Sequence, residues 1–274
     1  MSVRSRKAAL LRPKEILDEI RRCPLGYLPT GPLEWHGPHL PVGTDAINAE
    51  QSALLAAQET GGLVLPTLYW GTERERSPEM LDWLGFEPEQ WIVGMDFPAN
   101  SLPSLYASEE IFALLVREQL RLALKWRFRL IVLVTGHGAE NQIAVLNRLA
   151  AEFSAAGPAK VLVVLPFVAN SEGILEVGHA SRIETSLMLA LHPESVDRES
   201  LPPLPQPLQN TDWAIVDYET FLGNPTPERT VHAEDDPRQA TAELGSNIHH
   251  QAAAQVAARV KDALRVILES YKAG

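Results

Sequence analysis

Acidic and histidine side chains gather in one short segment of the chain, Leu33–Asp45, which reads LEWHGPHLPVGTD. The segment also holds two glycines and two prolines, which favour a loop over a helix or a strand. Carboxylates and imidazoles in one loop are groups that bind divalent metal ions. We take Glu34, His36 and Asp45 as candidate ligands, and we expect His39 to support the loop or the ligands rather than to bind metal.

Two further polar loops lie later in the chain. Residues 135–141 follow a strongly apolar run and read TGHGAEN, and residues 178–186 read GHASRIETS. The candidate residues in these two loops are His137, Glu140, His179 and Glu184. Our hypothesis is that all three loops meet at one metal site.

The number and kind of these side chains indicate a catalytic metal site. Three or four ligands per ion, with a position left open for water, are typical of catalysis rather than of structural binding. Five or six ligands suit two ions that share a bridging carboxylate, and such a pair can activate water and polarise a carbonyl. Imidazole and carboxylate ligands fit zinc, manganese or iron(II).

Each residue also has a structural interpretation. A histidine beside glycine is often a loop hydrogen-bonding residue, Glu34 would serve as a surface charge, and Asp45 stands where a helix N-cap would stand. The joint occurrence of the candidates makes the metal site the better interpretation. The remaining histidines lack such a context, and we expect them to be structural or exposed: His192, His232, His249 and His250.

Composition limits the classes of partner and the compartment. Hydrophobic residues make up 45% and charged residues 22% of the 274 residues, which is ordinary for a soluble protein, and we expect one domain over 1–274. The formal net charge of −11 argues against nucleic acid as the main partner. The single Cys23 suits a reducing cytoplasm. We read no signal peptide and no membrane span, and therefore expect a cytoplasmic protein.

Apolar patterns predict alternating helices and strands. We expect helices over 14–22, 46–59, 109–126, 140–153, 184–191 and 236–271, the last with Gly245 as the place for a break, and strands over 26–30, 63–68, 129–135, 159–166 and 211–216. The alternation indicates an α/β fold with an open, mostly parallel sheet. Ligand sites in such sheets lie at the carboxyl ends of the strands, where the three polar loops begin.

Residues 69–107 are the least regular part of the chain. A loop of this length is unusual unless it is functional or contains short elements. We consider two interpretations, a lid or subunit contact, and a surface excursion that contributes some aromatic residues to the core. The charged cluster 73–76, which reads ERER, is most simply a solvated face.

Other catalytic motifs find no support in the sequence. It contains no G-x-S-x-G elbow, no P-loop, no H-E-x-x-H motif and no G-x-G-x-x-G after the first strand, each of which carries a different chemistry.

The polar loops together resemble the creatininase (creatinine amidohydrolase) family. The segments that carry the resemblance are LPTGPLEWHGPHLPVGTD, TGHGAEN and HASRIETS, and the later DPRQATAELG is similar to the family's segment before the last helix. The resemblance spans nearly the whole chain. It implies a three-layer α/β/α fold, a homo-oligomer that is commonly a hexamer, a two-metal site, and hydrolysis of a cyclic amide or a related C–N bond.

The resemblance also implies roles for the candidate residues. Glu34 and His137 resemble ligands of one metal ion, His36 resembles a ligand of the other, and Asp45 resembles the bridge between them. The remaining carboxylate is Glu140 or Glu184, which we rate equally, because GHGAEN is one residue longer before the asparagine than the family's G-H-x-E-N and G-H-G-G-N motifs. His179 resembles the family's histidine near the substrate, a proton shuttle to the leaving nitrogen, and a nearby carboxylate, Glu140 or Glu184, is the alternative catalytic group for that step.

The expected activity is a dinuclear, zinc- or manganese-dependent amidohydrolase, with iron as a further choice of metal. The family's creatinine pocket uses a tryptophan before the substrate histidine, whereas residues 173–178 here read GILEVG, so we expect a small-molecule amide other than creatinine. Two alternatives stay open. One is a deformylase-like or peptidase-like relative that acts on a linear amide, and the other is a catalytically silent, metal-stabilised binding or scaffold protein.

Overall fold

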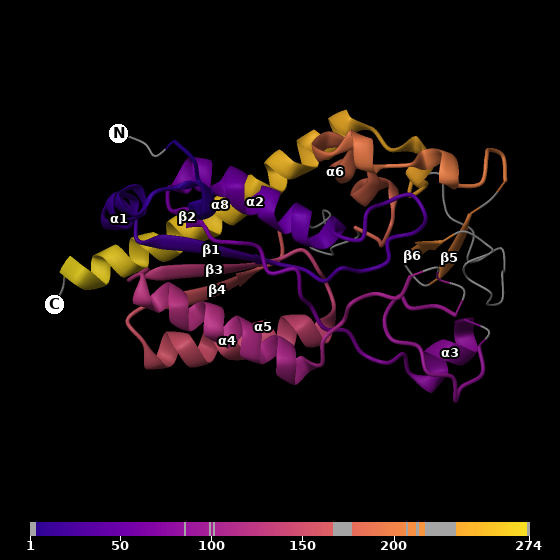
Figure 1. Ribbon diagram of the computed structural model, residues 1–274, viewed down its shortest axis with the longest axis horizontal. Helices are drawn as coiled ribbons and strands as arrows, with labels where there is room; N and C mark the ends of the chain where they lie inside the picture. Colours follow the sequence, from indigo (N-terminus) through magenta and orange to yellow (C-terminus); the bar gives the residue numbers. More distant parts are fainter. Residues whose placement is uncertain are drawn as a thin grey trace.

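A central sheet of four parallel strands organises the protein (Figure 1). The computed structural model describes residues 4–84, 86–98, 100, 102–166, 177–206, 208–211, 214–216 and 234–272. The strands are β1 (Leu25–Thr30), β2 (Leu63–Val64), β3 (Leu130–Thr135) and β4 (Lys160–Val164), in the spatial order β2-β1-β3-β4. Every pairing between them is parallel, so the predicted mostly parallel sheet is confirmed.

Helices cover both faces of this sheet (Figure 1). On one face lie α2 (Thr44–Thr60) and α8 (Ala242–Lys272), and α6 (Arg182–Leu191) packs against both of them. On the other face lie α4 (Glu109–Lys125) and α5 (Glu140–Ala156), while α1 (Pro13–Arg22) precedes β1. The arrangement confirms the expected three-layer α/β/α fold.

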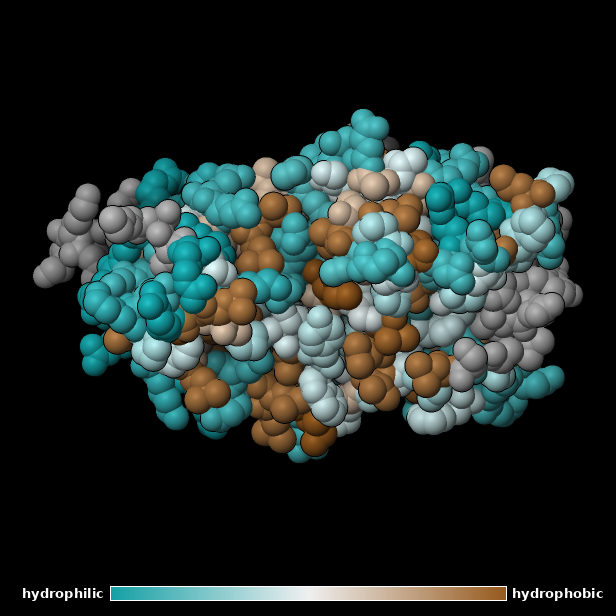
Figure 2. Space-filling view, turned by 45° about the horizontal axis from the view of Figure 1, so that its top comes forward, coloured by the Kyte–Doolittle hydropathy of each residue, from teal (hydrophilic) through white to brown (hydrophobic). Residues whose placement is uncertain are grey.

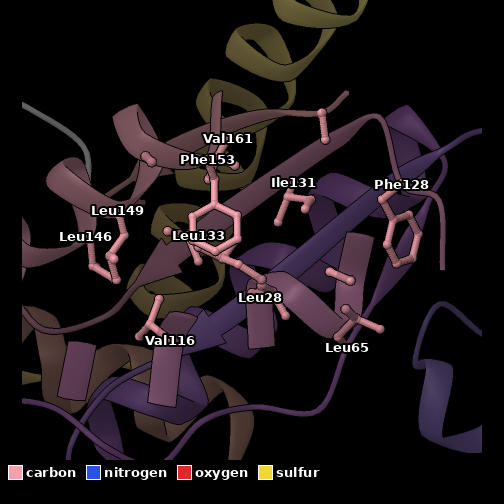
Figure 3. Packing of buried hydrophobic residues seen from close by; sticks show 14 of the residues in the cluster. Leu28, Leu65, Val116, Phe128, Ile131, Leu133, Leu146, Leu149, Phe153 and Val161 are labelled. Carbon is pink, nitrogen blue, oxygen red and sulfur yellow. The ribbon is translucent and has the colours of Figure 1, made fainter. Parts of the chain in front are cut away.

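The core explains why β3 is apolar along its whole length. Ile131 and Leu133 pack with α4 and α5 side chains such as Phe153 (Figure 3). Val132 and its even-numbered neighbours on β3 pack in the second cluster, which includes Val256 of α8. Successive strand residues point to opposite faces, and because both faces are covered, neither set of side chains is polar.

Several boundaries differ from those predicted by the sequence. The strand predicted over 159–166 as fully buried is β4, which lies at the edge of the sheet formed by the described strands and begins with the exposed Lys160. The strand predicted over 63–68 is hydrogen-bonded as a strand only at Leu63–Val64. The predicted strand 211–216 is instead two short antiparallel strands, β5 (Gln209–Thr211) and β6 (Ala214–Val216).

The last helix has no break at Gly245. It runs from Ala242 to Lys272, and a Cβ added at Gly245 would lie 1.8 Å from the carbonyl oxygen of Ser186. The glycine is therefore required by the close approach of α8 to α6, which only a residue without a side chain permits.

The described part of residues 69–107 contains one short helix, α3 (Pro78–Leu84), and contributes most of a small apolar cluster. The cluster packs around Trp35 and consists of Trp35, Leu81, Phe86, Ile92, Met95 and Phe97. This agrees with a surface excursion that contributes core aromatic residues. A lid or a subunit contact stays a prediction.

The surface mixes polar and apolar side chains. Figure 2 shows hydrophobic residues in several separate patches among hydrophilic ones on the face that it presents. Large exposed apolar side chains include Trp91, Leu105 and, on α4, Leu114. Among the described helices, none has the length and apolar character needed to cross a membrane.

Candidate metal centre

The polar loops meet where the sequence predicts, at the carboxyl ends of the central strands. Thr30 at the end of β1 pairs with Thr135 at the end of β3, so the loops that follow start side by side. The first loop carries Glu34 and His36, and the second carries His137. All three side chains are buried, which places ionisable groups where only paired or metal-bound groups are stable.

Helix first turns supply two more carboxylates. Asp45 is the second residue of α2, and Glu184 is the third residue of α6. Both are buried, and an acidic group in a first turn is favoured by the positive end of the helix dipole. The expectation that Asp45 stands in the N-cap position is wrong, because Gly43 holds that position and α2 begins at Thr44.

A glycine brings the second loop against α2. The N–H of Gly136 donates a hydrogen bond to the carbonyl oxygen of Thr30 at 3.0 Å. A Cβ at Gly136 would lie 1.9 Å from the carbonyl oxygen of Asp45. The absence of a side chain therefore lets the backbone of the His137 loop touch the first turn that carries Asp45.

Three groups of candidate ligands result: one consists of Glu34, His36 and His179, and the other two share Asp45. Of the two that share Asp45, the first is Glu34, Asp45 and His137, and the second is His36, Asp45 and Glu184; in each, the candidate ligand atoms lie within 4.8 Å of one another. His137 Nδ1 lies 3.1 Å from Glu34 Oε2 and 3.1 Å from Asp45 Oδ2. His36 Nε2 lies 3.2 Å from Asp45 Oδ1 and 3.8 Å from Glu184 Oε2. We call these the first and the second triad.

Hydrogen bonds outside the triads orient their members. His36 Nδ1–H donates to the carbonyl oxygen of Glu34 at 3.0 Å, which leaves Nε2 free to face Asp45. Glu184 Oε2 accepts from the Ala180 N–H at 2.6 Å, and Glu34 Oε1 accepts from the Tyr106 hydroxyl at 2.5 Å. Such outer contacts fix the tautomer and direction of metal ligands.

Buried side-chain oxygens without a hydrogen bond indicate whether these residues fit metal ions. Glu34 Oε2 and Asp45 Oδ2 are fully buried and accept no well-aligned hydrogen bond from the described residues, although His137 Nδ1 lies 3.1 Å from each. A buried carboxylate oxygen without a donor is costly, and a cation between the two oxygens and His137 Nδ1 would satisfy both. Two imidazoles and three carboxylates are a donor set for zinc or manganese. The site therefore fits divalent metal ions.

Electrostatics within the site follow from burial and opposite charge. Burial alone would lower the pKa of His36, but Asp45, Glu184 and Glu34 outweigh it and raise that pKa to about 10. Burial opposes protonation of His137 too, yet Glu34 and Asp45 hold its pKa well above the usual value. Burial raises the pKa of Glu184 to about 8, against the opposing effect of His36. In the metal-free protein, protons on these three side chains therefore balance the negative charge that bound metal ions would otherwise balance.

His179 lies against the site. Its ring stacks on that of His36 with centroids 4.1 Å apart, and its Nε2–H donates to the carbonyl oxygen of Trp35 at 2.6 Å. Burial, followed by the charge of His36, lowers its pKa to about 3. The ring is therefore neutral, with Nδ1 as the nitrogen that carries no proton.

His39 takes a supporting position. Its Nε2 forms a hydrogen bond with Thr185 Oγ1 at 2.9 Å, and it belongs to neither triad. Thr185 follows Glu184 on α6, so the contact ties the first polar loop to the helix that carries Glu184. Of the other histidines, His192 and His250 are not buried. His249 on α8 is buried near the carbonyl oxygen of Leu187 on α6. His232 lies outside the described residues.

Glu140 does not join the site. It is the first residue of α5, and its side chain is exposed. Of the two carboxylates that the sequence left open, the structure brings only Glu184 to His36.

Two residues near the site were not among the sequence candidates. Glu73 Oε2 lies 3.7 Å from His137 Nε2, and burial raises the pKa of Glu73, so the interpretation of 73–76 as a solvated face is wrong at this position. Tyr106 donates to Glu34. The only sequence signal for Glu73 was its place in the charged cluster 73–76, whereas nothing in the sequence singled out Tyr106.

The chain is similar to a curated protein named as a hydrolase and to solved structures of creatininases. A "3-dehydro-scyllo-inosose hydrolase" of Thermotoga maritima is 27% identical over 197 residues, which is 68% of this chain and 56% of that protein, so the match spans little more than half of the relative's length. A solved creatininase described with manganese is 22% identical, covers 95% of this chain and 99% of its own, and superposes with a TM-score of 0.66. A zinc-containing form of a creatininase variant gives 22% identity, the same coverage and a TM-score of 0.65.

At these identities the solved structures support the fold, and the sequence itself decides the family. The profile of the creatininase family, described as creatinine amidohydrolase, matches residues 9–260. That range contains both triads, His179 and every strand of the central sheet. The chain therefore belongs to the creatininase family.

Proposed function

We propose that the protein is a dinuclear metal-dependent hydrolase that cleaves an amide in a small molecule. The first triad, Glu34, Asp45 and His137, would hold one divalent ion, and the second triad, His36, Asp45 and Glu184, would hold the other. The observation that carries the proposal is that Asp45 belongs to both triads and offers one oxygen to each.

Solved creatininases described with manganese and with zinc support these two metals for this chain. A pair of divalent ions supplies Lewis acidity toward a carbonyl and lowers the pKa of water. The role of the protein is to hold the ligand atoms in place. Tyr106 fixes one oxygen of Glu34, Ala180 fixes one oxygen of Glu184, and the carbonyl of Glu34 fixes the ring of His36.

His179 is suited to move a proton at its Nδ1. Its Nε2–H is held by the carbonyl of Trp35, so the free lone pair is on Nδ1, in a ring that stacks on that of His36 in the second triad. A neutral imidazole in this position accepts a proton from the attacking water and passes it to the leaving nitrogen. The contact with Trp35 keeps the ring in the required tautomer.

One observation favours a second class of substrate. The curated relative is named for an inosose, a ketone of a cyclic polyol rather than an amide. A site that polarises a carbonyl and activates water would add hydroxide to either group. In the ketone the ring C–C bond beside that carbonyl would then break, with the electron pair stabilised by the second carbonyl that the prefix 3-dehydro denotes and the carbon taking up a proton. A polyhydroxylated cyclic ketone is therefore the second candidate substrate.

Metal content and a substrate panel test the proposal together. We expect about two zinc or manganese ions per chain by mass spectrometry of the reconstituted protein, and loss of metal and of turnover in Asp45→Asn. Asp262→Asn, at an exposed position of α8, is the matched control and should behave as wild type. The panel contains lactams, formamides, short peptides and cyclic polyol ketones.

The outcomes of these experiments separate the alternatives. Turnover of lactams, or of formamides and peptides, supports cyclic or linear amide hydrolysis respectively, and turnover of the ketones alone supports the second candidate. Metal binding that raises the melting temperature without any turnover supports a silent scaffold. Wild-type protein that takes up no divalent ion from zinc or manganese would overturn the mechanism.

A further inference from the structure

A cavity of about 640 Å³ lies beside the first triad. The side chains that matter for its chemistry are Glu73, Arg74, Glu75, Trp91, Asp96 and Tyr106. All of them come from the irregular region 69–107, so the cavity is built by the part of the chain that lies outside the regular α/β layers.

The cavity and the first triad share a wall. Tyr106 lines the cavity and donates to Glu34. Glu73 lines the cavity and places Oε2 3.7 Å from His137 Nε2. His137 is only 6% exposed, and its Nε2 has no hydrogen-bond partner among the described residues. A molecule in this cavity would therefore lie one side chain away from the candidate metal ligands.

The charge of the cavity is negative. Three carboxylates line it, from Glu73, Glu75 and Asp96, against one guanidinium, that of Arg74. Arg74 Nε is bound 3.0 Å from Glu109 Oε1, so its charge is already paired. The three carboxylates of the triads offset most of the charge of two divalent ions, and the excess of negative charge in the cavity therefore remains available to a ligand.

Two of the lining groups are suited to a cationic partner. Asp96 Oδ1 accepts a hydrogen bond from the Ser104 N–H at 2.7 Å, which holds this carboxylate at the wall of the cavity. Trp91 is 72% exposed and presents an indole at the cavity. Carboxylates and an aromatic face together bind ammonium and guanidinium groups.

We propose that this cavity selects substrates that carry a cationic group, an ammonium or a guanidinium, on the part remote from the bond that is hydrolysed. Glu75, Asp96 and Trp91 would bind that group, and Glu73 would lie between it and the metal centre. The proposal rests on the proposed function, because it assumes that the reacting end of the substrate sits at the triads.

Binding of metal-chelating hydroxamates tests this without turnover. The probes are ω-aminoalkyl hydroxamates with two, three and four methylene groups, the uncharged alkyl hydroxamates of equal length, and a polyhydroxylated hydroxamate, each titrated into zinc-loaded protein by calorimetry. We expect at least one amine to bind about tenfold tighter than its uncharged match, because a hydrogen bond between an ammonium group and a carboxylate is stronger than one between neutral groups. The preference should fall at high salt.

Substitutions in the cavity test which residues cause the preference for amines over uncharged probes. In Glu75→Gln combined with Asp96→Asn, we expect the ratio of affinities between amine and uncharged probe to fall close to one. Glu79→Gln, on the exposed side of α3 and outside the cavity lining, should keep the wild-type ratio. Equal affinity of amines and uncharged probes for the wild type, or tighter binding of the polyhydroxylated probe, would overturn the proposal while the metal centre stands. Failure of every hydroxamate to bind would instead remove the metal centre.

Discussion

Glu184 Oε2 lies 3.8 Å from His36 Nε2 and also accepts a hydrogen bond from the Ala180 N–H. The first turn of α6 is thereby fixed against the first polar loop. Glu140 is also a glutamate in one of the polar loops, and the sequence alone makes it an equally good candidate ligand. Its side chain is exposed to solvent.

This relationship predicts different results for two glutamate variants. Glu184→Gln should lower the metal content from about two ions per chain to about one, because an amide is a poor ligand for these ions. Glu140→Gln should keep both ions. Mass spectrometry of the two proteins after identical reconstitution makes the comparison, and loss of metal in Glu140→Gln alone would contradict the placement of Glu184.

Tyr106→Phe should weaken metal binding without unfolding the protein. The hydroxyl fixes Glu34 Oε1, and loss of such an outer contact typically lowers metal affinity about 10–100-fold. Competition with a fluorescent chelator measures the affinity. Tyr69→Phe, at a half-exposed tyrosine outside both triads, is the control, and equal affinities in the two variants would show that the Tyr106 hydroxyl does not support the ligand.

Metal binding should release protons and strengthen as pH rises. In the absence of metal, the pKa of His36 is raised to about 10, that of His137 is raised well above its usual value, and that of Glu184 is raised to about 8. These groups hold protons at neutral pH and must lose them to bind metal, so protons compete with the ion. Between pH 8 and pH 6 Glu184 takes up its proton, while the two imidazolium groups stay protonated and must still lose their protons to the solution when metal binds, so binding weakens as the pH falls.

Calorimetry in buffers of different ionisation enthalpy counts the protons released. At pH 7 we expect about two to three per chain on binding two ions, from the two imidazolium groups and Glu184. His36→Gln should release fewer. A proton count near zero in the wild type would mean that the ligands are already deprotonated in the metal-free protein.

Two glycines that flank His137 should respond differently to alanine. A Cβ at Gly136 would lie 1.9 Å from the carbonyl oxygen of Asp45, whereas a Cβ at Gly138 would have no atom within 4 Å. Gly136→Ala should lower the free energy of unfolding by about 1–3 kcal/mol or more through overpacking and should reduce metal content. Gly138→Ala should change neither by much. Urea denaturation followed by metal analysis checks both, and similar behaviour of the two variants would contradict the close approach.

Much of the scaffold could be predicted from the sequence. The apolar run at β3 and the helical spacing of α1, α4 and α5 give the order and type of these elements, because a strand buried on both faces and a helix with one buried face impose different repeats on the sequence. The rule that ligands bind at the carboxyl ends of parallel strands then predicted that Glu34, His36 and His137 would meet.

Boundaries and edges could not be predicted in this way. Whether β4 lies at the edge of the sheet depends on which strands pair with it, and Lys160 at its start gave only a weak local signal. Gly245 suggests a break in a helix when it is considered alone, yet it is the contact point between α8 and the backbone of Ser186. These features depend on the neighbour that each element meets, which local sequence does not record.

The sequence by itself therefore determined the family, the fold class and most of the chemical groups that the site contains. Only the tertiary structure decided that Glu184 rather than Glu140 faces His36. It also decided that Glu73 lies next to His137 and that Tyr106 donates a hydrogen bond to Glu34. The physical reason is that a side chain's chemistry is local, whereas its direction is set by the packing of its helix or loop against distant elements. α6 is held by α8 and α2, and its first turn points inward, while α5 begins at the surface with Glu140 exposed.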